Sequence, residues 1–319
     1  MFDRSSVDRW RQNARFLPAR PALWARVMGN YVRMIVLREP CLRVVTVALT
    51  YQCQLSCAHC SARSLSAAQS EKDRLTLAQM KTLLSQAQGC GALNIHFTGG
   101  EPLLCPDLYD YASLVDTSRN ILSCVTNGLL LSRESRRLKR ARFDLVIVSI
   151  DSPRASVHDR LRGYSGTHRQ AWQGIEKARG EGLSVMVAMV VTHENLLNGE
   201  VEEQINLCRK ENIVLQLLPA RAQPLWGKAL TPEDMKIFYE MTSSGDPRWD
   251  GCSSYFSPRC LAGRERVYVD PTGNVYPCDF IQQSFGNVKN EPLRVIWERM
   301  LKVSPYSRPQ KHCLTARAG

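Results

Sequence analysis

The chain has 319 residues, a mass of 36.1 kDa and a mean hydropathy of -0.26, enough for one large domain plus a small one. No apolar run reaches the roughly 18 to 20 residues that span a bilayer, so an integral membrane protein is not expected. The net charge of +12 favours nucleic acid, acidic lipid or an anionic substrate as a partner. The twelve cysteines cluster as metal ligands do, so we expect a reducing, cytoplasmic location.

Residues 1–42 alternate large apolar side chains with arginines, which predicts basic, amphipathic helices in an N-terminal adapter. Two interpretations stay open for this segment. It packs across one end of the main domain, or it docks on a membrane surface or a partner helix. A second basic segment, residues 133–142, is either a solvated helix face or a binding patch.

From residue 43, short β-branched runs alternate with helix-length segments, the pattern of βα units and a parallel sheet. The expected strands are 43–49, 92–97, 121–126, 145–150, 184–191 and 213–218. The expected helices are 75–89, 104–117, 132–141, 168–182 and 200–211. After Pro219 the pattern changes to a helix near 232–244 and a cysteine-bearing region rich in Gly and Pro. We therefore expect a core domain over 43–230 and a small domain over 231–319.

Three cysteines, Cys53, Cys57 and Cys60, follow the first expected strand in a Cys-x3-Cys-x2-Cys arrangement. A structural zinc or a closed iron–sulfur cluster needs four protein ligands, so three thiolates on one loop suggest a cluster with one open iron. A zinc loop or three unrelated buried thiols is the alternative. Parallel barrels carry their chemistry at the carboxyl ends of the strands, where this loop is expected.

This spacing resembles the radical S-adenosylmethionine (SAM) superfamily, in which the open iron of a [4Fe–4S] cluster binds the amino and carboxylate groups of SAM. The resemblance implies an α/β fold with a partial (β/α)6 TIM-type barrel. It also implies that SAM is cleaved reductively to a 5′-deoxyadenosyl radical, which abstracts a hydrogen atom from the substrate. A flavodoxin or ferredoxin would supply the electron. The residue before the third cysteine is usually a large aromatic in this family, and here it is His59.

Further motifs follow the next expected strands at positions that resemble the family's SAM-contacting segments. Gly99, Gly100 and Glu101 form a Gly-Gly-Glu turn whose glycines allow close backbone approach to a ligand and whose carboxylate or carbonyl can accept from the SAM ammonium. Asn127, Ser149, Asp151 and Arg162 are further candidate SAM or substrate contacts. For Ser149 and Asp151, N-capping of the next segment is the alternative. For Arg162, a surface salt bridge competes with a bidentate clamp on the SAM carboxylate.

A second group, Cys252, Cys260, Cys278 and Cys313, lies near the C-terminus. The segment between Cys260 and Cys278 reads as a hairpin and resembles the front half of the SPASM extension of radical SAM enzymes. The back half of its cysteine array is missing, so the shorter twitch type with one auxiliary [4Fe–4S] cluster fits better than two clusters. A mobile Cys313, leaving an open iron, and a structural zinc are the alternatives.

The resemblance indicates the cofactors and the type of reaction more clearly than the substrate. We expect modification of a ribosomally made peptide or protein, with a separate partner for peptide recognition, by analogy with SPASM and twitch enzymes. The alternative is oxidation or rearrangement of a small molecule derived from a sugar, lipid or tetrapyrrole, with the N-terminus as a peripheral membrane contact. A non-catalytic iron–sulfur or zinc protein that binds nucleic acid is the third hypothesis.

Overall fold

The computed structural model describes residues 20–60, 62, 73–220, 229–243, 246–249 and 259–316. The predictions for residues 1–19 and for Cys252 lie outside this part of the chain. No helix in it is long and apolar enough to cross a membrane.

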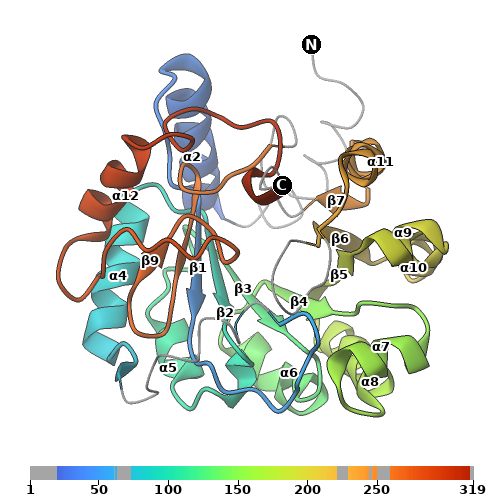
Figure 1. Ribbon diagram of the computed structural model, residues 1–319. Coiled ribbons are helices and arrows are strands. Elements are labelled where there is room, and N and C mark those ends of the chain that lie inside the picture. Colours follow the sequence, from blue (N-terminus) through green and yellow to red (C-terminus); the bar gives the residue numbers. More distant parts are fainter. Residues whose placement is uncertain are drawn as a thin grey trace.

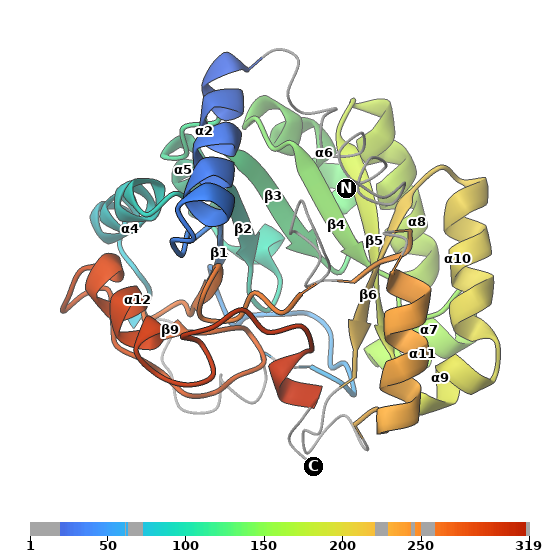
Figure 2. The same cartoon turned by 90° about the horizontal axis from the view of Figure 1, so that it is seen from above.

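One curved sheet organises the molecule, with helices along its outer side (Figures 1 and 2). Its strand order is β7-β6-β5-β4-β3-β2-β1-β8-β9, and all neighbours are parallel except the antiparallel pair β8 and β9. The strands are β1 (Val44–Ala48), β2 (Asn94–Thr98), β3 (Ile121–Thr126), β4 (Leu145–Ser149), β5 (Ser184–Val191), β6 (Val214–Pro219), β7 (Arg248–Trp249), β8 (Arg266–Val269) and β9 (Val275–Tyr276). The sheet is the expected partial barrel, and β7, β8 and β9 extend it beyond the six strands read from the sequence.

The helices of the βα units cover the convex face of the sheet and bury a continuous apolar core against it. The helical elements are α2 (Pro21–Tyr31), η1 (Val32–Val36), α4 (Leu77–Gly89), η3 (Pro102–Leu104), α5 (Leu108–Ser113), α6 (Leu131–Arg140), α7 (Ala155–Arg162), α8 (Thr167–Gly180), α9 (His193–Leu197), α10 (Glu200–Lys210), α11 (Pro232–Thr242), α12 (Leu293–Leu301) and η5 (Leu314–Ala316). The helix predicted over 104–117 is shorter, because Pro106 interrupts it and the chain forms η3 and α5 instead.

Local sequence explains where these elements begin. The side chain of Thr76 accepts from the backbone N–H of Gln79, whose own side chain accepts from the Thr76 N–H, a capping box that starts α4. Thr231 and Asp234 start α11 in the same way. The strands are near-continuous apolar runs because helices bury one of their faces and a cavity lies against the other.

Helix α2 packs across one end of the sheet, as one of the two interpretations of the N-terminal segment predicts. Leu23 and Val27 form a cluster with Leu93 and Ile121, which lie where β2 and β3 begin. Further along, η1 and the residue after it leave Val36 and Leu37 more than half exposed. A membrane or partner contact through this exposed stretch stays a prediction.

The C-terminal segment joins the core sheet directly through β8, which pairs with β1 with Val44 opposite Arg266. A buried ion pair fixes this junction. Arg43 donates through Nε to Oε2 of Glu265 at 2.9 Å and contacts it again through Nη2, and Arg259 binds the other carboxylate oxygen at 2.6 Å. The Arg43 and Glu265 side chains are only 1% and 3% exposed. The C-terminal region is therefore continuous with the barrel at this edge.

Candidate active site

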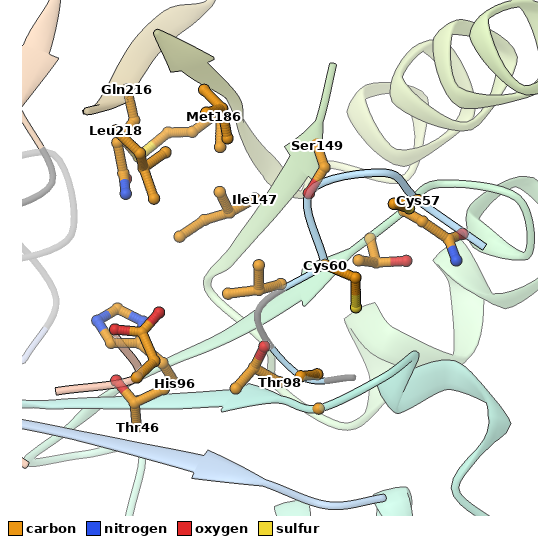
Figure 3. A pocket seen from close by; sticks show the side chains of 18 of the residues that line it. Thr46, Cys57, Cys60, His96, Thr98, Ile147, Ser149, Met186, Gln216 and Leu218 are labelled. Carbon is orange, nitrogen blue, oxygen red and sulfur yellow. The ribbon is translucent and has the colours of Figure 1, made fainter. Parts of the chain in front are cut away.

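The three cysteines of the first motif lie where expected, on the loop that leaves the carboxyl end of β1. Cys53, Cys57 and Cys60 all line one cavity of about 310 Å³ on the concave side of the sheet. Figure 3 shows Cys60, Ser149 and Thr98 turned toward the same space. The loop is tied to the end of α7, because the Ala58 N–H donates to the carbonyl of Leu161 at 2.9 Å.

Two polar side chains reach the sulfur atoms of this loop. Nδ2 of Asn127 lies 3.7 Å from Sγ of Cys53, and Nη1 of Arg162 lies 3.7 Å from Sγ of Cys57. Burial raises the pKa of both thiols, and these donors, with the Leu55 N–H on Cys53, act in the opposite direction. Donors aimed at sulfur stabilise thiolate over thiol, which is the form that binds iron.

The donor set of this loop is chemically suited to an iron–sulfur cluster, because its three ligands are thiolates. Ligands of one zinc ion sit about 2.3 Å from it and hence close to each other, whereas cysteines of a [4Fe–4S] cluster bind different irons and stand further apart. Three thiolates around an open cavity suit a cluster with one iron left for another ligand.

The Gly-Gly-Glu turn packs against the backbone of the cysteine loop. A Cβ atom on Gly99 would lie 2.3 Å from the Thr50 carbonyl oxygen, and one on Gly100 would lie 2.3 Å from the Gln52 carbonyl oxygen. The Gly100 and Glu101 N–H groups donate to those same two carbonyls at 2.7 and 2.8 Å. The glycines therefore allow close approach to the loop that carries the cysteines, a role that the sequence interpretation had assigned only toward a ligand.

The carboxylate of Glu101 is fully buried and accepts hydrogen bonds from donors of the protein itself. Thr126 Oγ1 at 2.7 Å and the Leu103 N–H at 3.1 Å donate to Oε1, and the Asn127 N–H donates to Oε2 at 2.8 Å. Burial raises its pKa to about 7 despite these bonds. Glu101 thus links the end of β2 to the end of β3 and positions Asn127, and a SAM contact through its carbonyl stays a prediction.

Asp151, Arg162 and His59 form a buried ionic cluster beside the cysteine loop. Oδ2 of Asp151 lies 2.7 Å from Nη2 of Arg162 and 2.9 Å from Nε2 of His59. Burial alone would raise the pKa of Asp151, but Arg162 and His59 outweigh it and hold the pKa well below its usual value. All three residues line the cavity, so Arg162 is fixed next to Cys57 with its guanidinium at the cavity wall.

The remaining predicted contacts also lie at this end of the cavity. Asn127 and Ser149 line it, whereas α7 begins after Arg154 and has no side-chain cap. N-capping is therefore not what Ser149 and Asp151 do. The structure brings together the three cysteines, the two glycines, Asn127, Ser149, Asp151 and Arg162 in one cavity wall. Glu101 does not line the cavity, and its carboxylate accepts hydrogen bonds from Thr126 and from the Asn127 N–H.

His158 supports the site without entering it. Its Nδ1 accepts from the Asp151 N–H at 3.2 Å, and the ring is completely buried. Burial, reinforced by nearby Arg162, lowers the pKa of His158 to about 4, so the ring is neutral in the folded protein.

This depressed pKa predicts a pH-dependent stability. In the unfolded chain, His158 has an ordinary pKa of about 6.5 and is protonated below that pH, whereas in the folded protein the ring stays neutral down to about pH 4. The free energy of unfolding is therefore highest above pH 6.5 and falls as the pH drops toward 4. We expect the free energy of unfolding to fall by about 2 kcal/mol between pH 7 and pH 5 through this residue. Urea titrations should show this fall reduced in His158→Gln and retained in a variant of the exposed His193. An unchanged pH dependence in His158→Gln would contradict the assignment.

The rest of the cavity is built by residues that the sequence interpretation missed. Thr46, His96, Gln216, Arg248, Arg266, Asp279 and Phe280 line it together with apolar strand residues. The ring nitrogen Nδ1 of His96 is hydrogen-bonded to Oγ of Ser123. These side chains come from β1, β2, β6, β7 and the C-terminal region, so only the folded sheet brings them together.

A second, small cavity collects the C-terminal cysteines. Cys260, Cys278 and Cys313 line it, next to Trp249 and Arg266, which also line the large cavity. Cys313 is 2% exposed, and its hydrogen bond with Cys260 is the largest cause that raises the pKa of the Cys260 thiol. The alternative of a mobile Cys313 is thus disfavoured, and three of the four predicted auxiliary ligands converge.

Comparisons with known proteins agree with this geometry. The sequence-family model of the Radical SAM superfamily matches residues 47–208. The sequence-family model of SPASM, an iron–sulfur cluster-binding domain, matches residues 260–314. The AdoMet-dependent heme synthase of Oleidesulfovibrio alaskensis is 24% identical over 89% of this chain and 81% of its own length. The mycofactocin maturase MftC of Mycobacterium tuberculosis is 24% identical over 83% of this chain and 73% of its own. The crystal structure of Streptococcus suis SuiB bound to precursor peptide SuiA superposes with a TM-score of 0.65 at 15% identity, over 92% of this chain and 70% of that one.

The chain belongs to the radical SAM superfamily and carries a C-terminal SPASM iron–sulfur domain. It is a radical SAM enzyme that uses a [4Fe–4S] cluster with SAM together with auxiliary iron–sulfur clusters. Because it is an enzyme, the hypothesis of a non-catalytic protein that binds nucleic acid is excluded. The assignment of individual residues to the clusters and to SAM, the number of auxiliary clusters and the domain boundaries near 42 and 230 remain our proposals.

Proposed function

We propose that this enzyme modifies a ribosomally made peptide or protein, one residue of which enters the cavity between the cysteine loop and the auxiliary cysteines. Cys53, Cys57 and Cys60 would hold the catalytic cluster, and Gly99, Gly100, Asn127, Ser149 and Arg162 would hold SAM. When bound, the cluster and SAM supply the radical that abstracts a hydrogen atom from an unactivated carbon. The protein's own part is to orient that carbon and to exclude water.

The likeness to proteins that act on peptides is the observation that carries this proposal. SuiB bound to its precursor peptide SuiA shares the fold over 92% of this chain, and a relative named PqqA peptide cyclase is 27% identical over 78% of it. The cavity is consistent with this proposal, because the cysteine loop lines it and Asp279, the neighbour of Cys278, lines it as well. A residue inserted there would lie between the two groups of cysteines.

A second candidate is a tetrapyrrole-derived small molecule. It is favoured by the heme synthases, which are 24–25% identical over at least 80% of this chain. The distinction is experimental. Anaerobically reconstituted enzyme with SAM and dithionite should form 5′-deoxyadenosine, and a short peptide encoded beside the gene should change mass in the same reaction. Turnover of a tetrapyrrole instead of the peptide would replace the proposal, and absence of 5′-deoxyadenosine from a protein with intact clusters would overturn both.

The auxiliary cysteines give a further expectation. Cys278 lies on the wall next to the large cavity, since its neighbour Asp279 lines that cavity. In Cys278→Ala, peptide turnover should be lost while substrate-free SAM cleavage falls much less, because the first cluster does not depend on this thiol. The two products are quantified in one reaction by mass spectrometry. Equal loss of both would show that Cys278 serves the first cluster or the fold instead.

A reductant such as flavodoxin or ferredoxin and a separate peptide-recognition partner are part of the same proposal. They are tested by adding each candidate to the assay in place of dithionite or together with the peptide.

A further inference from the structure

The C-terminal region reaches both ends of the sheet. It supplies β8 and β9 at one end. At the other end lies Trp249 of β7, which pairs with Leu217 of β6 and lines both the large cavity and the small cavity of the C-terminal cysteines. In Figures 1 and 2 the chain crosses from α12 toward α11 and β7 before it forms η5. The small cavity therefore lies where the C-terminal segment returns to the barrel.

Tyr239 of α11 holds this returning segment at Cys313. Its hydroxyl oxygen accepts a hydrogen bond from the Cys313 N–H at 2.8 Å. The centroid of the Tyr239 ring lies 5.4 Å from the Trp249 ring in an edge-on contact and 5.0 Å from the His312 ring. Trp249 is buried and belongs to the sheet, so these contacts fix the orientation of the Tyr239 ring. The hydroxyl is therefore an acceptor in a set position.

The sulfur of Cys313 also has defined neighbours. It is hydrogen-bonded with Cys260, and its Sγ lies 3.3 Å from Oγ1 of Thr315 in η5. Cys260 is fixed in turn, because its N–H donates to the Gln310 carbonyl at 2.9 Å. A cysteine that binds iron is a thiolate and has no proton to donate, so the Thr315 hydroxyl is the donor once Cys313 is a ligand. Hydrogen bonds to the sulfur atoms help to set the reduction potential of an iron–sulfur cluster.

We infer that Tyr239 and Thr315 are positioning residues of the auxiliary cluster and that both act through Cys313. Tyr239 fixes the backbone of Cys313 so that its sulfur stays beside Cys260. The Thr315 hydroxyl donates to that sulfur, which favours the more negative, reduced cluster and raises its reduction potential. This inference rests on the proposed function, in which the C-terminal cysteines bind the auxiliary cluster, but it does not depend on which substrate is modified.

The role of Thr315 is tested by the potential of the auxiliary cluster. Reconstituted full-length enzyme is titrated with dithionite and followed by electron paramagnetic resonance. The signal that survives when Cys53, Cys57 and Cys60 are replaced with alanine belongs to the auxiliary cluster. Thr315→Val keeps the shape of the side chain without the hydroxyl and should shift the potential of this signal to a lower value. Thr315→Ser restores the donor and should keep the wild-type potential. An unchanged potential in Thr315→Val would overturn the role of Thr315.

The role of Tyr239 is tested by the rate at which iron leaves the protein. Tyr239→Phe keeps the ring and removes only the acceptor of the Cys313 N–H. Auxiliary iron should be lost to EDTA at least about tenfold faster, as when other partners of a metal ligand are removed. Tyr111→Phe is the matched control, because the buried Tyr111 hydroxyl donates to the Leu75 carbonyl and lines neither cavity. Equal rates of iron loss in the two variants would overturn the role of Tyr239.

Cys313→Ala separates this inference from the proposed function. It should lose the auxiliary iron and the auxiliary signal. If both are retained, Cys313 is not a ligand and the inference fails with that assignment. If the wild-type enzyme turns over no peptide, the proposed substrate class fails, whereas the potential and the rate of iron loss, which are measured without substrate, still decide the roles of Tyr239 and Thr315.

Discussion

Replacing Cys57 with alanine is expected to abolish SAM cleavage. Cys57 is the central thiol of the loop, is buried, and lies next to the guanidinium of Arg162. With two thiolates left, the first cluster loses one iron anchor. Removing a residue that only hydrogen-bonds a metal ligand typically lowers metal affinity or activity about 10–100-fold. Because Cys57→Ala removes a proposed ligand itself, we expect 5′-deoxyadenosine formation to fall at least about 100-fold. Iron should drop from about eight to about four atoms per chain if one auxiliary cluster persists.

The control for this variant is another buried thiol. Cys208 lies in α10, is hydrogen-bonded by the Gln204 side chain and lines neither cavity. Cys208→Ala should keep iron content and SAM cleavage at the wild-type level. The fold of Cys57→Ala should also survive, because Arg162 retains its ion pair with Asp151. Normal SAM cleavage by Cys57→Ala would contradict the assignment of the catalytic cluster.

Much of the barrel could be predicted from the sequence because its signals are local. β3 and β5 have the predicted bounds, since β-branched runs are a property of neighbouring residues. The short helix α7 was missed, because its polar residues after Pro153 give no apolar period. Nor does any local pattern say that β8 lies beside β1. Strand pairing across more than two hundred residues depends on contacts such as Arg43 with Glu265.

The candidate site divides in the same way. The cysteine loop and the Gly-Gly-Glu turn are contiguous motifs and could be found in the sequence. The role of Glu101 could not, because its three donors come from other segments. Arg162 and His59 were read separately, and only the fold shows that both bind Asp151. Arg266 carried no signal at all, since a single arginine at the start of a strand becomes meaningful only through its neighbours in the sheet.

Replacing Glu265 with glutamine is expected to have the largest effect on stability. Glu265 compensates two arginines, of which Arg43 is almost completely buried. Removing one member of a buried ion pair leaves an uncompensated charge and typically costs about 3–5 kcal/mol. Urea titration of the reconstituted protein should show this loss. The double variant Arg43→Met/Glu265→Gln should recover part of it, because the buried charge is gone.

Glu291→Gln provides the comparison, since the Glu291 ion pair with Arg299 is partly exposed and such pairs contribute little. If Glu265→Gln costs no more than this surface variant, the ion pair does not hold β8 to β1. The ion pair also lies next to a residue that lines the large cavity. Glu265 immediately precedes Arg266, and its backbone carbonyl accepts from the N–H groups of Arg43 and Val44 at 2.9 Å each. The contact that joins the C-terminal region to the barrel therefore also sets the position of Arg266 in the wall of the large cavity, and loosening it should disturb that wall along with the fold.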